Sequence, residues 1–189
     1  MIETIMEWLR HEPTSLDDWL ELTAVALMGG IAMAGIAFAH GGSNPAAVMY
    51  ERSLTVSEDG QMGRAWKLTL FVLGETIFYQ GILMTATVYY SADDLNVIAS
   101  AVAVAIAQGF LPPHHHLPMQ TRIAACLGGF ILSLIFLKCG GWQNTWPLIH
   151  ARAFIATWLA HLVPVTVLSA VFAYNHRNRE STTTTPRPP

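Results

Sequence analysis

The chain has 189 residues, of which 52% are apolar and only 12% are charged, and its mean hydropathy is +0.38. Soluble domains carry about 25% charged residues, so this composition excludes an ordinary water-soluble globule. Disorder over most of the length is excluded as well, because it requires low hydrophobicity and high net charge, and the formal net charge here is only −3. The composition predicts an integral membrane protein.

Residues 1–15 predict a short amphipathic helix that lies in the headgroup layer, with Trp8 as its anchor. Its apolar residues recur at helical spacing opposite charged ones: Ile2, Ile5, Met6 and Leu9 against Glu3, Glu7 and Arg10. The acidic residues argue against a cleavable signal peptide. A frayed terminus is the alternative. Ser15 with Asp18 resembles a capping box and predicts the start of the next helix.

Five apolar runs follow, and we expect each to form a membrane-spanning helix: 22–39, 68–90, 95–111, 123–137 and 153–174. Glu75 is their only charged residue, and the other 22 charged residues lie outside. The fourth run has only 15 residues, but the Lys138 side chain can snorkel toward the interface. The predicted fold is an all-α bundle of five transmembrane helices over residues 16–176, followed by a disordered cytoplasmic tail at 177–189.

The distribution of basic residues predicts the orientation of this bundle. Seven fall on one side of the predicted membrane: Arg52, Arg64, Lys67, Arg122, Arg177, Arg179 and Arg187. Three fall on the other: Arg10, Lys138 and Arg152. Because cytoplasmic loops carry the excess of Lys and Arg, we expect the N-terminus outside and the C-terminus inside, in a bacterial inner membrane.

Small residues in the first predicted span favour close helix packing. Ala26, Gly30 and Ala34 stand four residues apart, with Gly29, Ala32 and Gly35 beside them. We expect this packing to occur within the chain, with an oligomer interface as the alternative. Nucleotide-binding glycine motifs and a basic stripe are absent from the sequence, so no nucleic-acid partner is predicted.

The histidines are the first candidate site. Five of the eight fall at the predicted cytoplasmic ends of helices: His40, His114, His115, His116 and His176. Imidazole is a common ligand of Co, Ni, Zn and Cu, so one hypothesis is a divalent-metal site in which the PPHHHLP loop supplies one or two nitrogens. The three consecutive histidines cannot all point the same way. The alternative is a solvated polar loop.

A second hypothesis concerns the last span, in which His150 and His161 share one helix face about 16 Å apart. Two such histidines could ligate haem b or pass a metal ion inward. The alternative for His150 is an interfacial residue beside Arg152.

Glu75 is the candidate functional centre, because a charged side chain inside the membrane is costly and usually marks a pathway. Thr76, Tyr79, Gln80 and Thr87 extend a polar stripe on the same helix. Straight helices would place Glu75 and His161 about 10 Å apart in depth, with Tyr79 or Gln80 as the bridge and Pro164 freeing a carbonyl beside His161. The alternative is a protonated, hydrogen-bonded Glu75 with a structural role.

Short strings resemble the five-helix predicted cobalt transporter subunit family: MYE at Met49 to Glu51, LPP and LP at Leu111 to Pro113 and Leu117 to Pro118, and ARAF at Ala151 to Phe154. The link between the last two helices is shorter here than that family leads us to expect. The resemblance implies a subunit of a metal transporter, and no functional residues are carried over from it.

Three functions therefore remain open. The first is a permease, or permease subunit, that moves a divalent transition-metal ion through a midplane site formed by Glu75, Tyr79, Gln80 and His161. The second is a haem- or quinone-binding subunit of an electron-transfer complex, and the third is a structural or assembly subunit. In each case we expect other membrane subunits as partners and no catalysis by this chain alone.

Overall fold

The computed structural model describes residues 2–39, 61–91, 93–142, 150–163 and 165–166. Within these ranges the protein is entirely helical, and its elements run α1 (Ile2–Arg10), α2 (Leu16–Ala39), α4 (Gln61–Thr76), the π-helix η1 (Ile77–Met84), α5 (Thr85–Tyr89), α6 (Asp94–Phe110), α7 (Met119–Phe136), the π-helix η2 (Leu137–Gly141) and an unlabelled helix, Ala151–Val163. The all-helical prediction is confirmed for these residues.

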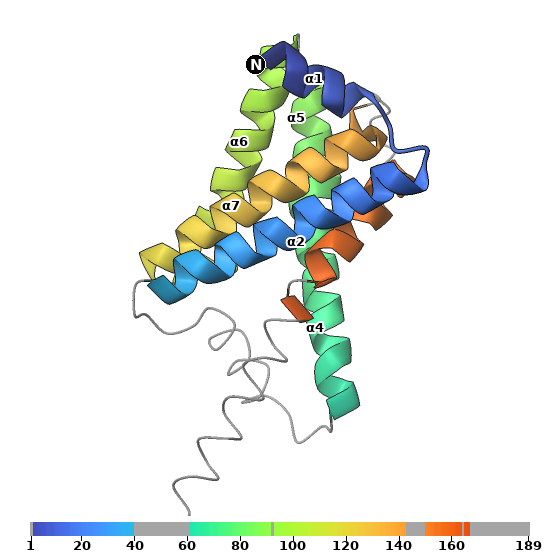
Figure 1. The fold of residues 1–189 in the computed structure, drawn as a ribbon. Coiled ribbons are helices and arrows are strands. Elements are labelled where there is room, and N and C mark those ends of the chain that lie inside the picture. The colour runs from blue at the N-terminus through green and yellow to red at the C-terminus, as the bar shows by residue number, and fades with distance from the viewer. Residues whose placement is uncertain (1, 40–60, 92, 143–149, 164, 167–189) are drawn as a thin grey trace, which may run out of the picture.

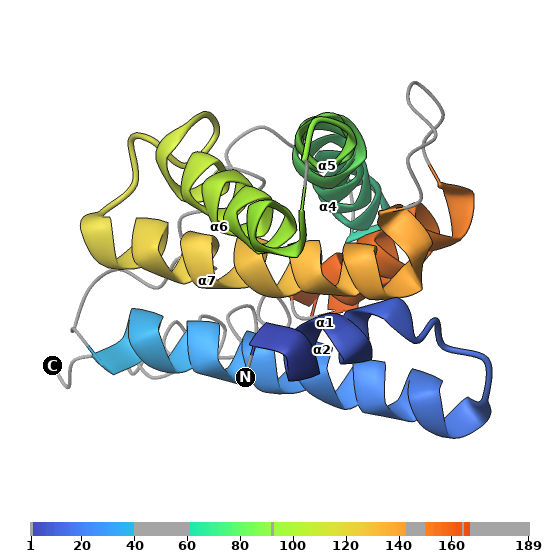
Figure 2. The same ribbon diagram turned by 90° about the horizontal axis from the view of Figure 1, so that it is seen from above.

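Helix α7 lies in the middle of the molecule. It packs against α2 on one side and against α6 and η1 on the other (Figure 2). Figure 1 shows that α2 and α7 run side by side in opposite directions and cross the α4–α5 column obliquely. The buried core lies where these elements meet, with Tyr79, Met84 and Phe136 among its largest side chains.

Two continuous helices in the described residues are long and apolar enough to cross a membrane, Trp66–Tyr89 and Met119–Gly141. Two further apolar helices, Asp94–Phe110 and Ala151–Val163, are shorter than a full span. The described helices overlap the predicted runs in position, and the part of the fifth run beyond residue 166 lies outside the described residues. Length and composition alone do not distinguish a spanning helix from a buried core helix, so five spans and their orientation stay predictions.

Helix α1 forms as predicted, but the protein itself covers part of its apolar face. Met6 and Leu9 are completely buried in the core, and α1 packs against η2. Lys138 is 2% exposed and donates hydrogen bonds to the carbonyl oxygens of Trp8 and His11. The prediction that Lys138 snorkels is therefore wrong, because α1 lies over its ammonium group.

The capping box at the start of α2 is confirmed. The backbone N–H of Ser15 donates to Asp18 Oδ2 at 2.9 Å, and the N–H of Asp18 donates to Ser15 Oγ at 3.2 Å. The N–H of Thr14 also donates to the same carboxylate. These backbone hydrogen bonds hold the pKa of Asp18 well below its usual range.

The small residues bring the helices together within the chain. A Cβ at Gly29 would lie 2.5 Å from Ile131 Cδ1, and one at Gly109 would lie 2.5 Å from the carbonyl oxygen of Arg122. These close approaches join α2 to α7 and α6 to α7. The expectation of intrachain packing in the first apolar run is therefore confirmed at Gly29, and Gly109 shows a similar close approach between α6 and α7.

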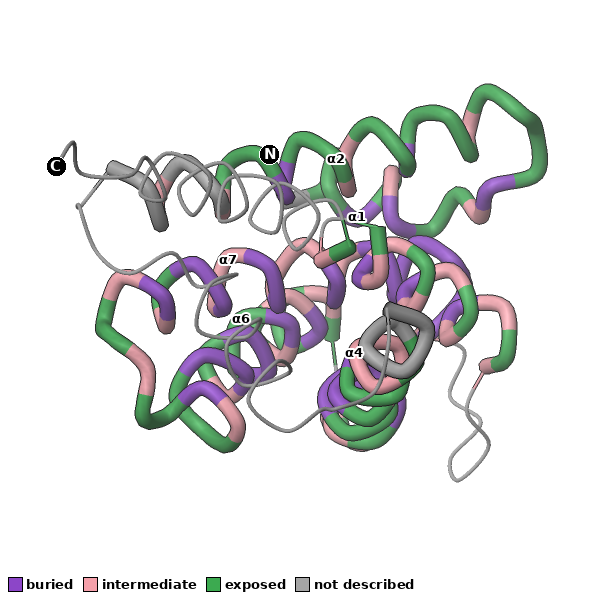
Figure 3. Tube along the Cα trace, turned by 90° about the horizontal axis from the view of Figure 1, so that it is seen from below, coloured by how far each residue is buried: buried purple, intermediate pink, exposed green. Residues whose placement is uncertain are grey.

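Large apolar side chains also cover the outside. Along α2 most residues are exposed (Figure 3), and Met28 and Ile31 are 70% and 72% exposed. The remaining long helices also carry exposed apolar side chains, including Phe78, Ile106, Ile123 and Leu159. Soluble monomers rarely expose large contiguous apolar patches, so this surface is suited to contact with lipid or with other apolar helices.

Candidate functional site

Glu75 lies near the C-terminal end of α4, directly before the change to the π-helix η1. Its side chain is buried, with the residue only 6% exposed. Neither carboxylate oxygen has a hydrogen-bond partner among the described residues. Buried polar atoms are normally paired, and π-helical turns occur frequently at functional sites. The position therefore marks a candidate site.

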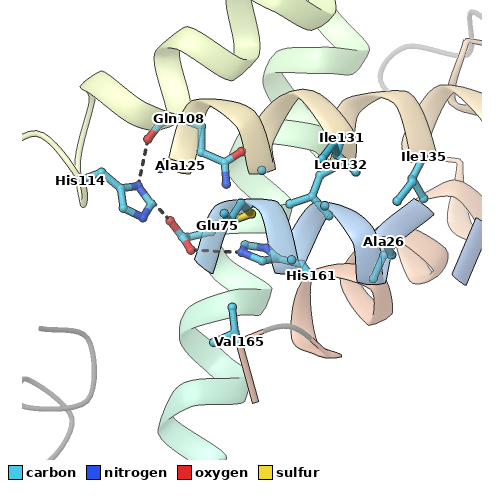
Figure 4. Close-up of a pocket in the computed structure, with 15 residues that line it drawn as sticks. Ala26, Glu75, Gln108, His114, Ala125, Ile131, Leu132, Ile135, His161 and Val165 are labelled. Atoms are coloured by element: carbon cyan, nitrogen blue, oxygen red, sulfur yellow. Dashed lines mark hydrogen bonds and ion pairs between the residues drawn. The ribbon is translucent and has the colours of Figure 1, made fainter. Parts of the chain in front are cut away.

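Two buried histidines flank this carboxyl group (Figure 4). His114 Nδ1 lies 3.5 Å from Glu75 Oε1, and His161 Nε2 lies 3.7 Å from Glu75 Oε2. Both separations exceed a normal hydrogen bond. The three residues come from α4, the turn after α6 and the Ala151–Val163 helix, so the fold brings together groups far apart in sequence.

The expected 10 Å gap between Glu75 and His161 is wrong, and so is the expected bridge. The two side chains face each other directly. Tyr79 instead donates to the carbonyl oxygen of Pro112, and Gln80 Nε2 donates to Gln108 Oε1 at 3.0 Å. Straight, parallel helices would give the 10 Å gap, whereas the helices of this protein cross obliquely (Figure 1). Pro164 lies outside the described residues.

The turn after α6 carries His114 inward. The N–H of His114 donates to the carbonyl of Leu111, and the N–H of Leu117 donates to the carbonyl of His114. The bond from Tyr79 to Pro112 joins this turn to η1. His114 Nδ1 also lies 2.9 Å from the carbonyl oxygen of Gln108. Burial lowers the pKa of His114, with the Gln108 carbonyl acting in the opposite direction.

A cavity of about 70 Å³ adjoins the three groups. Its lining residues are Ala26, Gly29, Gly30, Met33, Glu75, Gln108, His114, Ala125, Gly128, Ile131, Leu132, Ile135, Ala160, His161 and Val165. Small residues of α2 and α7 supply much of this wall and leave room in front of the carboxyl group. The rest of the lining is apolar, so the polar groups of the cavity are those of Glu75, Gln108, His114 and His161. A cavity of this volume has room for an ion with a few water molecules next to these groups.

The predicted cytoplasmic histidine cluster is described only in part, because His40 and His176 lie outside the described residues. His114 points inward, whereas His115 and His116 are exposed, with their rings edge to face at 5.0 Å. The three histidines therefore point in different directions, as predicted. Among the residues that the structure describes, no group of three or more His, Cys, Asp or Glu is placed to hold a metal ion.

His150 and His161 play different parts in the structure. His150 precedes the Ala151–Val163 helix, and its Nδ1 accepts the N–H of Ala153 at 3.4 Å. His161 faces Glu75 and Thr76 instead. His150 therefore accepts a hydrogen bond from the first turn of this helix, and of the two histidines only His161 belongs to the buried site.

Sequence reasoning missed Gln108 and assigned His114 to a different site. Gln108 is 3% exposed, lines the cavity and accepts a hydrogen bond from Gln80. The sequence does single out Gln108, because it is the only amide side chain near the end of the apolar run AVAVAIAQGF. The turn that brings His114 to Glu75 could not be predicted from helical spacing.

Comparisons of the chain with protein-family models, curated proteins and solved structures give no match. The resemblance to the cobalt transporter subunit family therefore stays a prediction.

Proposed function

We propose that the chain is an integral membrane protein, with its helices arranged as a five-helix transmembrane bundle whose N-terminus lies outside. Two helices have the length and composition of membrane spans, and apolar side chains cover the outward faces of several helices. In water such a surface would associate, whereas in a bilayer it is solvated by lipid. The seven-to-three distribution of Lys and Arg supports the orientation.

Within this bundle, Glu75 and His161 form a binding site for a divalent transition-metal ion on its way across the membrane. The protein is a permease or permease subunit for that ion. The observation that carries this function is the buried carboxyl group of Glu75, which has no hydrogen-bond partner among the described residues and faces an imidazole nitrogen beside a cavity. A carboxylate oxygen with an imidazole nitrogen is a donor set that suits zinc and its neighbours.

The geometry is close to that of a metal-ligand pair. Two ligand atoms each about 2.1 Å from a tetrahedral ion are separated by about 3.4 Å. Glu75 Oε2 and His161 Nε2 are 3.7 Å apart, so a small movement would let both contact one ion. Permanent zinc sites use three or four protein ligands. A site with two protein ligands, in which water fills the other coordination positions, suits a transported ion that must also be released.

Metal binding to the purified protein tests this function. The detergent-solubilised chain is stripped with chelator, equilibrated separately with Co²⁺, Ni²⁺ and Zn²⁺, and analysed for retained metal. We expect retention by the wild type and by Glu7→Gln, which changes an exposed carboxylate of α1. Glu75→Gln keeps the side-chain shape but removes the negative charge, and we expect it to lose retention.

Equal retention by Glu75→Gln and the wild type would contradict the proposal, as would a folded wild type that retains none of the three ions. The visible absorption spectrum of the same sample adds a second criterion. A Soret band would favour the haem-binding function instead.

A further inference from the structure

Thr76 follows Glu75 in the sequence but contacts His161. It is completely buried, and its Oγ1 lies 3.2 Å from His161 Nδ1. The same hydroxyl group donates a hydrogen bond of 2.8 Å to the carbonyl oxygen of Val72, one turn earlier in α4. Thr76 therefore links the backbone of α4 to the imidazole ring on another helix.

Taken together, these two contacts favour one position for the hydrogen on His161. A hydroxyl group has one hydrogen to donate, and Thr76 gives it to Val72. Thr76 Oγ1 can then only accept from His161, so Nδ1 carries the hydrogen. A neutral imidazole has hydrogen on one nitrogen, and Nε2 is left with a lone pair. Nε2 is the atom that faces Glu75 Oε2.

We propose that Thr76 is a positioning residue that fixes His161 in the Nδ1–H tautomer, so that the Nε2 lone pair is presented to a metal ion at Glu75. The assignment rests on the proposed function of the Glu75–His161 pair. Histidines that bind metals commonly donate their other ring N–H to an oxygen atom, which fixes the tautomer and the ring orientation.

The competing tautomer shows why this contact matters. With hydrogen on Nε2, His161 would donate toward Glu75 Oε2 and occupy the space between the two ligand atoms. Removal of the Thr76 oxygen takes away the acceptor that stabilises the Nδ1–H form. The ring would then shift toward the Nε2–H form and compete with the ion.

Nitrogen NMR of isotope-labelled histidine in the metal-free protein tests the tautomer directly, with His161→Gln used to assign the signal. We expect the Nδ1–H form in the wild type and in Thr76→Ser, which keeps the hydroxyl, and a shift toward the Nε2–H form in Thr76→Val. Thr85→Val is the matched control, because Thr85 is buried and its Oγ1 has no hydrogen-bond partner in the part of the chain that the structure describes. It should leave the tautomer unchanged.

Co²⁺ titration of the wild type, Thr76→Ser, Thr76→Val and Thr85→Val measures the consequence for metal binding. We expect Thr76→Val to bind about 10- to 100-fold more weakly and Thr76→Ser to restore affinity. The same tautomer in Thr76→Val and the wild type, or equal losses of affinity in Thr76→Val and Thr76→Ser, would overturn the assignment. A wild type that binds no Co²⁺ overturns the proposed function, and the metal-free spectra still decide the tautomer.

Discussion

Lys138 and Glu75 are both ionisable side chains buried in an apolar helical protein, but their surroundings differ. Lys138 Nζ donates to two carbonyl oxygens at the end of α1 and lies 4.8 Å from the centre of the Trp8 ring. Glu75 has no hydrogen-bond partner among the described residues and faces a cavity. The Lys138 contacts hold α1 against η2. The carboxylate oxygens of Glu75 make no hydrogen bond within the described residues, and this supports the metal site that we propose there.

Ion pairs near Lys138 connect further elements of the structure. Nη2 of Arg10 in α1 donates to both carboxylate oxygens of Asp94, and Arg152 pairs with Glu12 at 3.1 Å. Together with Lys138, these pairs join α1 and the following turn to α6, η2 and the Ala151–Val163 helix. We therefore expect substitutions at Lys138 to affect stability and substitutions at Glu75 to affect binding.

The largest expected effect is that of Lys138→Met on stability. Met fills a similar volume but cannot donate, so the carbonyls of Trp8 and His11 lose their charged donor. We expect a loss of about 3 kcal/mol in the free energy of unfolding, measured by denaturant titration in detergent. Glu75→Gln should change the same free energy by less than about 1 kcal/mol. If Glu75→Gln is as destabilising as Lys138→Met, the distinction between the two regions fails.

The next effect concerns His114, which lies against Glu75 from the side opposite His161. His114→Asn should weaken Co²⁺ binding by about tenfold, because it removes a neighbour that orients the carboxyl group. His115→Asn is the control, since His115 is exposed. Equal effects of the two substitutions on Co²⁺ titration would mean that the inward turn of His114 has no role in binding.

The smallest effect is expected for Tyr79→Phe. This variant loses the hydrogen bond that joins η1 to the turn carrying His114. We expect about 1 kcal/mol less stability and a modest loss of Co²⁺ affinity. Amide hydrogen exchange of residues 111–117 gives the local measurement. Unchanged protection of these amides would show that Tyr79 does not hold the turn.

The sequence was informative about elements and about single residues. Apolar runs predicted the helices, and the Ser15–Asp18 pattern predicted a cap that is present. The isolated charge of Glu75 pointed to a residue that the structure buries beside two histidines. Helical spacing could not predict the contacts between helices, because these depend on crossing angles. The positions of His161 and His114 beside Glu75 therefore could not be predicted from helical periodicity.

The fate of Lys138 shows a second limit. Its position at the end of an apolar run is compatible with snorkelling, and only the location of α1 in space shows that backbone carbonyls cover it. Gln108 is a similar case, since its partner Gln80 belongs to another helix. Which buried polar residues find partners is a property of the tertiary structure, and that property separates Lys138 from Glu75.

Metal flux into proteoliposomes tests the central claim most directly. Vesicles that contain the wild type or Glu75→Gln at equal density are exposed to external Co²⁺, and entry is followed with a trapped metal indicator. If Glu75 is the transport site, the wild type takes up Co²⁺ and a Glu75→Gln protein of unchanged stability takes it up at least about 100-fold more slowly. Equal rates of uptake in the two preparations would contradict that claim.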